Sequence, residues 1–195
     1  QPGFIDRQDS EIDQPAIELD LNDFDGLTIK GGDSTVKGLV INGAIEGGAA
    51  LHLLDNGGNN VEKNFIGTDV TGNEARNEKN DGLRIKDLPD NLVKHNLISG
   101  NAVGVFVTLS GATGNKIEGN YIGTDIKGTI QVGNVQHGVK IQNASNNTIG
   151  GDTKAARNII SGNGAINAEE TSGLLIRGDS ARDGIDASGN KVQGN

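Results

Sequence analysis

The 195-residue chain contains no cysteine and no methionine, and aromatic residues make up only 3% of it. Without cysteine there is no disulfide framework, thiol nucleophile or cysteine-ligated zinc. No apolar run approaches the roughly 18 residues of a membrane-spanning helix, so we predict no membrane span. The formal net charge of -9 excludes a general nucleic-acid binder, because phosphate contacts require a basic excess.

Glycine is abundant by contrast, with 31 residues, and many of the asparagines lie beside a glycine. This composition would also suit a disordered chain, but disorder needs few large aliphatic residues. Isoleucine, leucine and valine instead recur at regular spacing, with polar residues between them. A disordered chain has no reason to keep such a spacing, so we predict a folded repeat protein.

Two short motifs alternate along the chain. The first is Asn, one residue, Val or Ile, two residues, Asn, one residue, Ile, with copies at Asn59–Ile66, Asn91–Ile98 and Asn115–Ile122. The second is a small residue, an aliphatic, a variable residue and an aliphatic. Its copies are Gly26–Ile29, Ala50–Leu53, Gly82–Ile85, Gly104–Val107, Gly138–Ile141 and Gly173–Ile176. Each repeat is therefore expected to contain two short strands separated by Gly/Asn turns.

The strict alternation of the two motifs favours a solenoid over a β-sandwich or barrel, in which the same strand pair would not recur. We predict an all-β fold, a right-handed parallel β-helix built as a single-stranded solenoid. Residues 1–25 would form an N-terminal leader and partial first rung, and residues 26–195 the β-helix.

Equivalent asparagines of successive rungs should stack, because in-register side-chain amides hydrogen-bond along the stack. We expect one such structural ladder at a bend of the coil, formed by Asn64, Asn96, Asn120 and Asn195. Asparagine, like glycine, also tolerates the left-handed backbone that a sharp bend requires. The recurring Gly-Asn pairs are therefore interpreted as structural.

Two longer insertions, Gly67–Gly72 and Gly123–Gly128, follow the same motif and should leave the coil on the same side. They place Asp69 and Asp125 at equivalent positions, where calcium could bind between the loops, because calcium takes carboxylate oxygens. The Thr-Asp-x-x-Gly context equally suits a plain Asx turn without a metal. No other cofactor is expected, since the three histidines fall at different positions of the repeat, without metal-ligand spacing.

The variable residues of the second motif should lie on one outer face in two columns. The first column is Thr28, His52, Arg84, Phe106, Lys140 and Leu175, and the second is Lys30, Leu54, Lys86, Thr108, Gln142 and Arg177. Neither column contains a carboxylate, so they predict a cationic strip that could hold an acidic polysaccharide, with Phe106 as an apolar platform. The candidate ligand contacts are Lys30, His52, Arg84, Lys86, Phe106, Lys140 and Arg177. Alternatively, long outward side chains only solubilise the sheet and prevent aggregation.

The strings NFIGTDVTGN, NYIGTDIKGT and NASNNTIGGDTKAARNIISGN resemble the right-handed parallel β-helix repeats of large bacterial surface proteins, of the kind frequent in cyanobacteria. The opening QPGF...PAIELD...DGLTIKGGDSTVKGLVIN resembles them too, so the resemblance covers nearly the whole chain. It implies the β-helix fold and an extracellular or cell-surface location. It implies no activity, because pectate lyases, epimerases, adhesins and filament subunits share the fold.

We therefore expect an extracellular, non-enzymatic module with a structural or adhesive role, in which every rung supports its neighbours. Its partners would be an acidic polysaccharide, a longer parent chain, or further copies stacked end to end into filaments. The alternative is a polysaccharide lyase or epimerase acting on uronate-containing glycans, with Arg84, Lys86 or Lys140 as the base. No acid partner is apparent for that base, and aromatic residues for sugar stacking are scarce.

Overall fold

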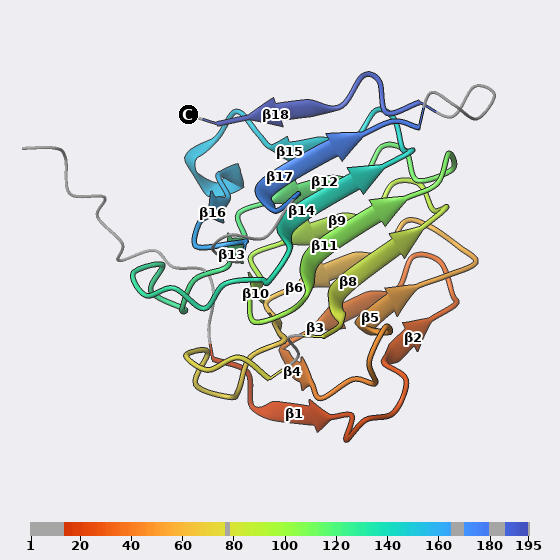
Figure 1. Ribbon diagram of the computed structural model, residues 1–195. Helices are drawn as coiled ribbons and strands as arrows, with labels where there is room; N and C mark the ends of the chain where they lie inside the picture. The colour runs from red at the N-terminus through yellow and green to blue at the C-terminus, as the bar shows by residue number, and fades with distance from the viewer. Residues whose placement is uncertain (1–13, 77–78, 165–169, 180–185, 195) are drawn as a thin grey trace, which may run out of the picture.

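The computed structural model describes residues 14–76, 79–164, 170–179 and 186–194. Three parallel sheets, here named A, B and C, wind around one axis, and each complete rung contributes one strand to each sheet (Figure 1). The predicted all-β, parallel β-helix class is confirmed. The expectation of two strands in each rung was wrong, because the first motif itself contains a corner: β6 (Asn60–Glu62) ends before Asn64, and β7 (Phe65–Ile66) begins after it.

The strands are short throughout and follow one another in the same spatial order in all three sheets. Sheet A consists of β1 (Ile17–Asp20), β4 (Leu39–Asn42), β7, β10 (Leu97–Ile98), β13 (Tyr121–Ile122) and β16 (Ile159–Ile160). Sheet B consists of β2 (Leu27–Ile29), β5 (Ala49–Leu53), β8 (Asp81–Lys86), β11 (Val103–Thr108), β14 (His137–Gln142) and β17 (Ser172–Arg177). Sheet C consists of β3 (Thr35–Lys37), β6, β9 (Leu92–Lys94), β12 (Lys116–Glu118), β15 (Thr148–Gly150) and β18 (Lys191–Gln193).

One short 3-10 helix, η1 (Lys154–Ala156), interrupts the coil within the described residues. It occupies the insertion that separates β15 from Asn158, and Asn158 then resumes the repeat. Among these residues no helix is long and apolar enough to cross a membrane.

The core is a single stack of aliphatic side chains that point inward from all three sheets. In sheet B, for example, the strand register places Leu51, Leu83, Val105 and Val139 directly over one another, and each of them is fully buried. Since every rung contributes only small aliphatics, the core keeps one width along the axis. The outer faces of the sheets are therefore regular surfaces, on which side chains one rung apart lie about 4.8 Å from each other.

The corners of the coil hold three asparagine ladders, where the sequence predicted one. The ladder between sheets C and A contains Asn64, Asn96, Asn120 and Asn158. The ladder between sheets B and C contains Asn59, Asn91, Asn115, Asn147 and Asn190. A shorter ladder between sheets A and B contains Asn101, Asn134 and Asn163. Asn195, the fourth member expected from the sequence, lies outside the described residues.

All three ladders run in the same direction. In each pair, the backbone N–H and the side-chain amide of one asparagine donate to the Oδ1 of the asparagine in the next rung, as Asn64 does to Asn96 at 3.0 Å in both bonds. The ladder asparagines do not adopt the left-handed backbone that the sequence suggested. At the C–A corner the residues before Asn64, Asn96 and Asn120 do so, namely Lys63, His95 and Gly119 at φ 56, 53 and 66°, whereas Arg157 before Asn158 is extended at φ -69°.

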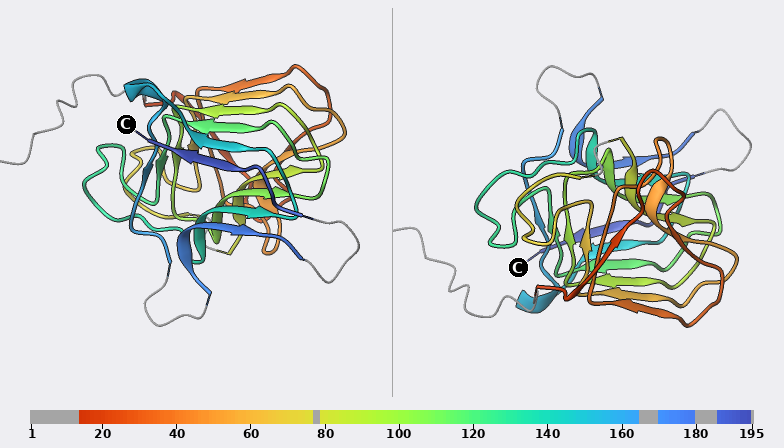
Figure 2. Two further views of the ribbon diagram at one scale, coloured as in Figure 1. Left: turned by 90° about the horizontal axis from the view of Figure 1, so that it is seen from above. Right: turned by 90° about the horizontal axis from the view of Figure 1, so that it is seen from below.

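The two insertions cover the outer face of sheet A, and they lie side by side in Figures 1 and 2. Phe65 and Leu97 point outward from this sheet but are fully buried, because they form a second apolar cluster with Ile126 of the later insertion. Sheet A is thus closed to solvent over several rungs. The outer faces of sheets B and C remain as the surfaces on which a ligand can bind.

Candidate ligand-binding face

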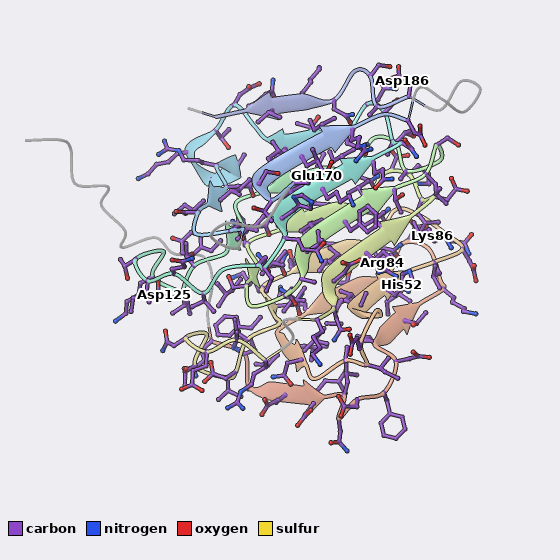
Figure 3. All side chains as sticks on the ribbon, viewed as in Figure 1. His52, Arg84, Lys86, Asp125, Glu170 and Asp186 are labelled. Carbon is purple, nitrogen blue, oxygen red and sulfur yellow. The ribbon has the colours of Figure 1, made fainter. Side chains whose placement is uncertain are left out.

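The outer face of sheet B carries the two columns expected from the sequence. The strand register aligns the first column in the order Thr28, His52, Arg84, Phe106, Lys140, Leu175. It also aligns Lys86, Thr108, Gln142 and Arg177 of the second column, whereas Lys30 and Leu54 directly follow β2 and β5. Figure 3 labels His52, Arg84 and Lys86 on this face of the neighbouring strands β5 and β8.

Phe106 lies between two cations at the centre of the face. The Arg84 guanidinium carbon is 5.9 Å from the centroid of the Phe106 ring, and the Lys140 ammonium nitrogen is 4.9 Å from it. These residues belong to the rungs on opposite sides of β11. The ring attracts both cations through cation–π interactions. That Phe106 also offers an apolar platform for a sugar stays a prediction.

A buried carboxylate also belongs to this face, although neither column contains one. Asp81 Oδ2 accepts a hydrogen bond from Arg84 Nε at 2.7 Å and forms an ion pair with Arg84 Nη2 at 2.6 Å. Burial raises the pKa of Asp81, and the positive charge of Arg84 opposes that rise. The sequence contained the signal, since Asp81 directly precedes the motif copy Gly82–Ile85. The alternation of inward and outward residues did not indicate Asp81, because by that alternation only the variable residues of the motif point outward.

A second carboxylate lies at the far end of the strip. Glu170 Oε2 is 3.6 Å from Arg177 Nη1, and both side chains are more than half exposed. Such an exposed pair stabilises little, about 0–1 kcal/mol, but it offsets part of the charge of Arg177. Lys30, Lys86 and Lys140 therefore provide most of the available positive charge on the face.

Both histidines of sheet B are poor proton acceptors. Burial and the nearby charges of Arg84 and Lys86 lower the pKa of His52 below its usual value. Burial and the charge of Lys140 likewise lower the pKa of His137, whose Nδ1 is 3.1 Å from Ser172 Oγ. Since both imidazoles are neutral at pH 7, His52 adds no positive charge to the strip.

The outer face of sheet C has the opposite organisation. One of its columns reads Lys37, Glu62, Lys94, Glu118 in successive rungs, so positive and negative charges alternate. Glu62 is paired from both sides, at 2.8 Å from Lys37 Nζ and 3.3 Å from Lys94 Nζ. The hydrogen bond from Lys37 lowers the pKa of Glu62 to about 2. This column of sheet C thus neutralises its own charges, whereas neither column of sheet B has such an alternation of positive and negative charge.

Asp69 and Asp125, the two calcium candidates, both bind the backbone of their own loops. Asp69 Oδ1 accepts from the amides of Asn73 at 3.0 Å and Glu74 at 3.1 Å. Asp125 Oδ1 accepts from the amide of Ile130 at 2.8 Å. Burial opposes ionisation, but the hydrogen bonds outweigh it and lower the pKa of each carboxyl. The Asx-turn interpretation accounts for both loops without calcium.

The fold and these surfaces define a parallel β-helix repeat protein whose sheet B carries a row of cations on its outer face. Comparison with known families finds a match between residues 53–135 and the family model described as periplasmic copper-binding protein (NosD). The match runs from β5 to the segment before β14 and spans less than half of the chain. No curated protein and no solved structure matches the chain.

The residues present do not fit a copper site. Copper favours thiolate, thioether and imidazole ligands, and the chain contains neither cysteine nor methionine. His52 and His137 lie in β5 and β14, three strands apart in sheet B, and His95 lies at the C–A corner. Over the residues that the structure describes, no group of three or more His, Cys, Asp or Glu side chains could hold a metal ion. The similarity to the copper-binding family is therefore best explained by the repeat.

Proposed function

We propose that this chain is an extracytoplasmic scaffold that binds an acidic polysaccharide lengthwise along the outer face of sheet B. The observation that carries the proposal is the contrast between the two outer faces. Sheet C pairs Lys37 and Lys94 with Glu62, but sheet B places Lys86 and Lys140 in a strip whose columns contain no carboxylate. The extracytoplasmic location is supported by the word periplasmic in the description of the matching family and by the resemblance to bacterial surface repeats.

The geometry of the strip suits a linear polymer. Successive rungs advance about 4.8 Å along the axis, so the strip presents a straight row of contacts rather than a closed pocket. Arg84 is held by Asp81, and Lys140 is held over Phe106, before any ligand binds. Such preorganisation reduces the conformational entropy that binding must offset. We therefore expect the strip to offer carboxylate or sulfate groups a straight row of cations at fixed positions.

The test removes two lysine charges from the outer face of sheet B, removes two from the outer face of sheet C in a second variant, and compares how strongly each variant is retained on the polymer. The double variant Lys30→Gln/Lys86→Gln should weaken retention on a uronate-rich polymer in low-salt affinity electrophoresis about five- to thirty-fold, or about 1–2 kcal/mol. The control Lys116→Gln/Lys191→Gln removes the same charge from exposed positions of sheet C and should change retention little. Equal losses in both variants would show a bulk charge effect and would refute a site on sheet B.

The contacts of two of the three candidate bases disfavour the enzymatic alternative. Arg84 Nε and Nη2 lie 2.7 and 2.6 Å from Asp81 Oδ2, and Lys140 Nζ lies 4.9 Å from the centroid of the Phe106 ring. Both cations are therefore already engaged within the protein rather than free to approach a uronate. Incubation with polygalacturonate and alginate should give no absorbance from unsaturated uronate, and a steady rise in absorbance would support the lyase instead.

A further inference from the structure

Charged and uncharged rungs alternate along most of the strip on sheet B. The rung of β2 is followed by Lys30, and the rungs of β8 and β14 carry Lys86 with Arg84 and Lys140, respectively. Between them, the rung of β5 offers Leu54 and the neutral His52, and the rung of β11 offers Phe106 and Thr108. The cations therefore recur at every second rung.

The last rung follows this pattern only in part. Arg177 of β17 directly neighbours the charged rung of β14, but its guanidinium lies 3.6 Å from the carboxylate of Glu170. The partly neutralised Arg177 is thus a weaker contact than Lys86 or Lys140. The alternation holds where the cations are available to a ligand.

The alternation sets a distance that a ligand must match. Strands in a sheet are about 4.8 Å apart, so cations two rungs apart are separated by about 10 Å along the axis. An extended β-linked disaccharide has a similar length. We propose that the strip selects a linear polysaccharide with one anionic group on every second sugar, an inference that rests on the proposed binding function. The uncharged sugars would then lie against His52, Leu54, Phe106 and Thr108.

A polymer with a carboxylate on every sugar fits less well. A carboxylate at the rung of β5 would face the apolar side chain of Leu54 and the neutral His52, where it would lose hydration without gaining a cation from that rung. Specificity of this kind comes from leaving a charge unpaired in the wrong ligand. The strip therefore discriminates by charge period and not by total charge.

The experiment compares hyaluronan, which carries one uronate per disaccharide, with polygalacturonate, which carries one per sugar. In calorimetric titrations at low salt and matched uronate concentration, the unmodified protein should bind hyaluronan about tenfold more tightly, or about 1.4 kcal/mol. The variant Leu54→Lys/Thr108→Lys adds cations to both neutral rungs and should shift the preference toward polygalacturonate. The control Thr35→Lys adds charge to an exposed position of sheet C and should leave the preference unchanged.

The outcomes separate this inference from the proposal on which it rests. If polygalacturonate binds as tightly as hyaluronan, and Lys30→Gln/Lys86→Gln weakens both, the period argument is wrong but the strip remains a binding site. If neither polymer binds, or if removal of those lysines changes nothing, the proposed function itself fails. The comparison of two polymers on the unmodified protein does not depend on the folding of any variant.

Discussion

The substitution Asn96→Ala tests the idea that the ladders, and not only the aliphatic core, stabilise the coil. Asn96 is fully buried in the middle of the C–A ladder and forms five side-chain hydrogen bonds. Its Oδ1 accepts from the backbone and side-chain amides of Asn64, and its Nδ2 donates to Asn120 and to the carbonyls of Val61 and Lys94. Alanine can replace none of these bonds.

The expected loss follows from the groups left without partners. The backbone N–H of Asn64 loses the acceptor that Asn96 provides, and an unsatisfied buried group costs about 1–3 kcal/mol. The four other lost bonds contribute about 1 kcal/mol each, so the sum before relaxation is about 5–7 kcal/mol, and relaxation of the neighbouring groups should reduce the loss to about 3–6 kcal/mol. Because a domain is typically stable by only about 5–15 kcal/mol, this single change should approach the limit of stability.

Urea denaturation followed by far-UV circular dichroism measures the effect. With a slope of about 2–3 kcal/mol/M, the midpoint should fall by about 1–3 M. The control is Asn56→Ala, because Asn56 is exposed and its amide donates one bond, to the carbonyl of Lys30 at 2.9 Å. That variant should lose less than about 1 kcal/mol. A midpoint for Asn96→Ala equal to that of the control would refute a structural role for the ladder.

Three further outcomes are expected. Leu109 adopts a left-handed backbone at φ 75°, at a position where another rung has Asn143, so Leu109→Asn should stabilise the fold by about 0.5–1 kcal/mol in the same urea assay. The pKa of Glu62 is lowered from 4.5 to about 2, so its stabilisation is complete above pH 4.5 and is lost as the pH falls through 2. Since Lys37 is 54% exposed, we discount this contribution to about 1 kcal/mol, and Glu62→Gln should abolish that part of the stability–pH curve. Calorimetric titration with Cu(II) should show no binding tighter than about 10 µM, and a tight one-to-one isotherm would contradict the absence of a copper site in the described residues.

The repeat pattern was sufficient to predict the fold class and the alignment of the outer columns. Both follow from periodicity, since residues at equivalent positions of a repeat must stack if the coil is regular. The number of strands in each rung did not follow. Strands as short as β7, with two residues, are defined by the corner before them, and the bend expected at Asn64 did not show that it divides the motif into two strands of different sheets.

The candidate site was only partly predictable. The columns were visible because they use the alternation of strand residues, but Asp81 lies just outside the motif and reaches Arg84 through the orientation of its side chain. The position of Phe106 between two cations likewise depends on which rotamers fit between neighbouring rungs. Contacts of this kind arise from packing in three dimensions, and a pattern of residue types does not determine them.

The single direction of the ladders has a consequence for how the chain acquires its shape. The backbone N–H of Asn64 gains its acceptor only when Asn96 is in place, and the backbone N–H of Asn96 likewise requires Asn120. Each newly synthesised turn therefore completes the polar contacts of the turn made before it. The rungs can therefore fold one after another from the amino terminus during synthesis, and each new rung stabilises the rung before it.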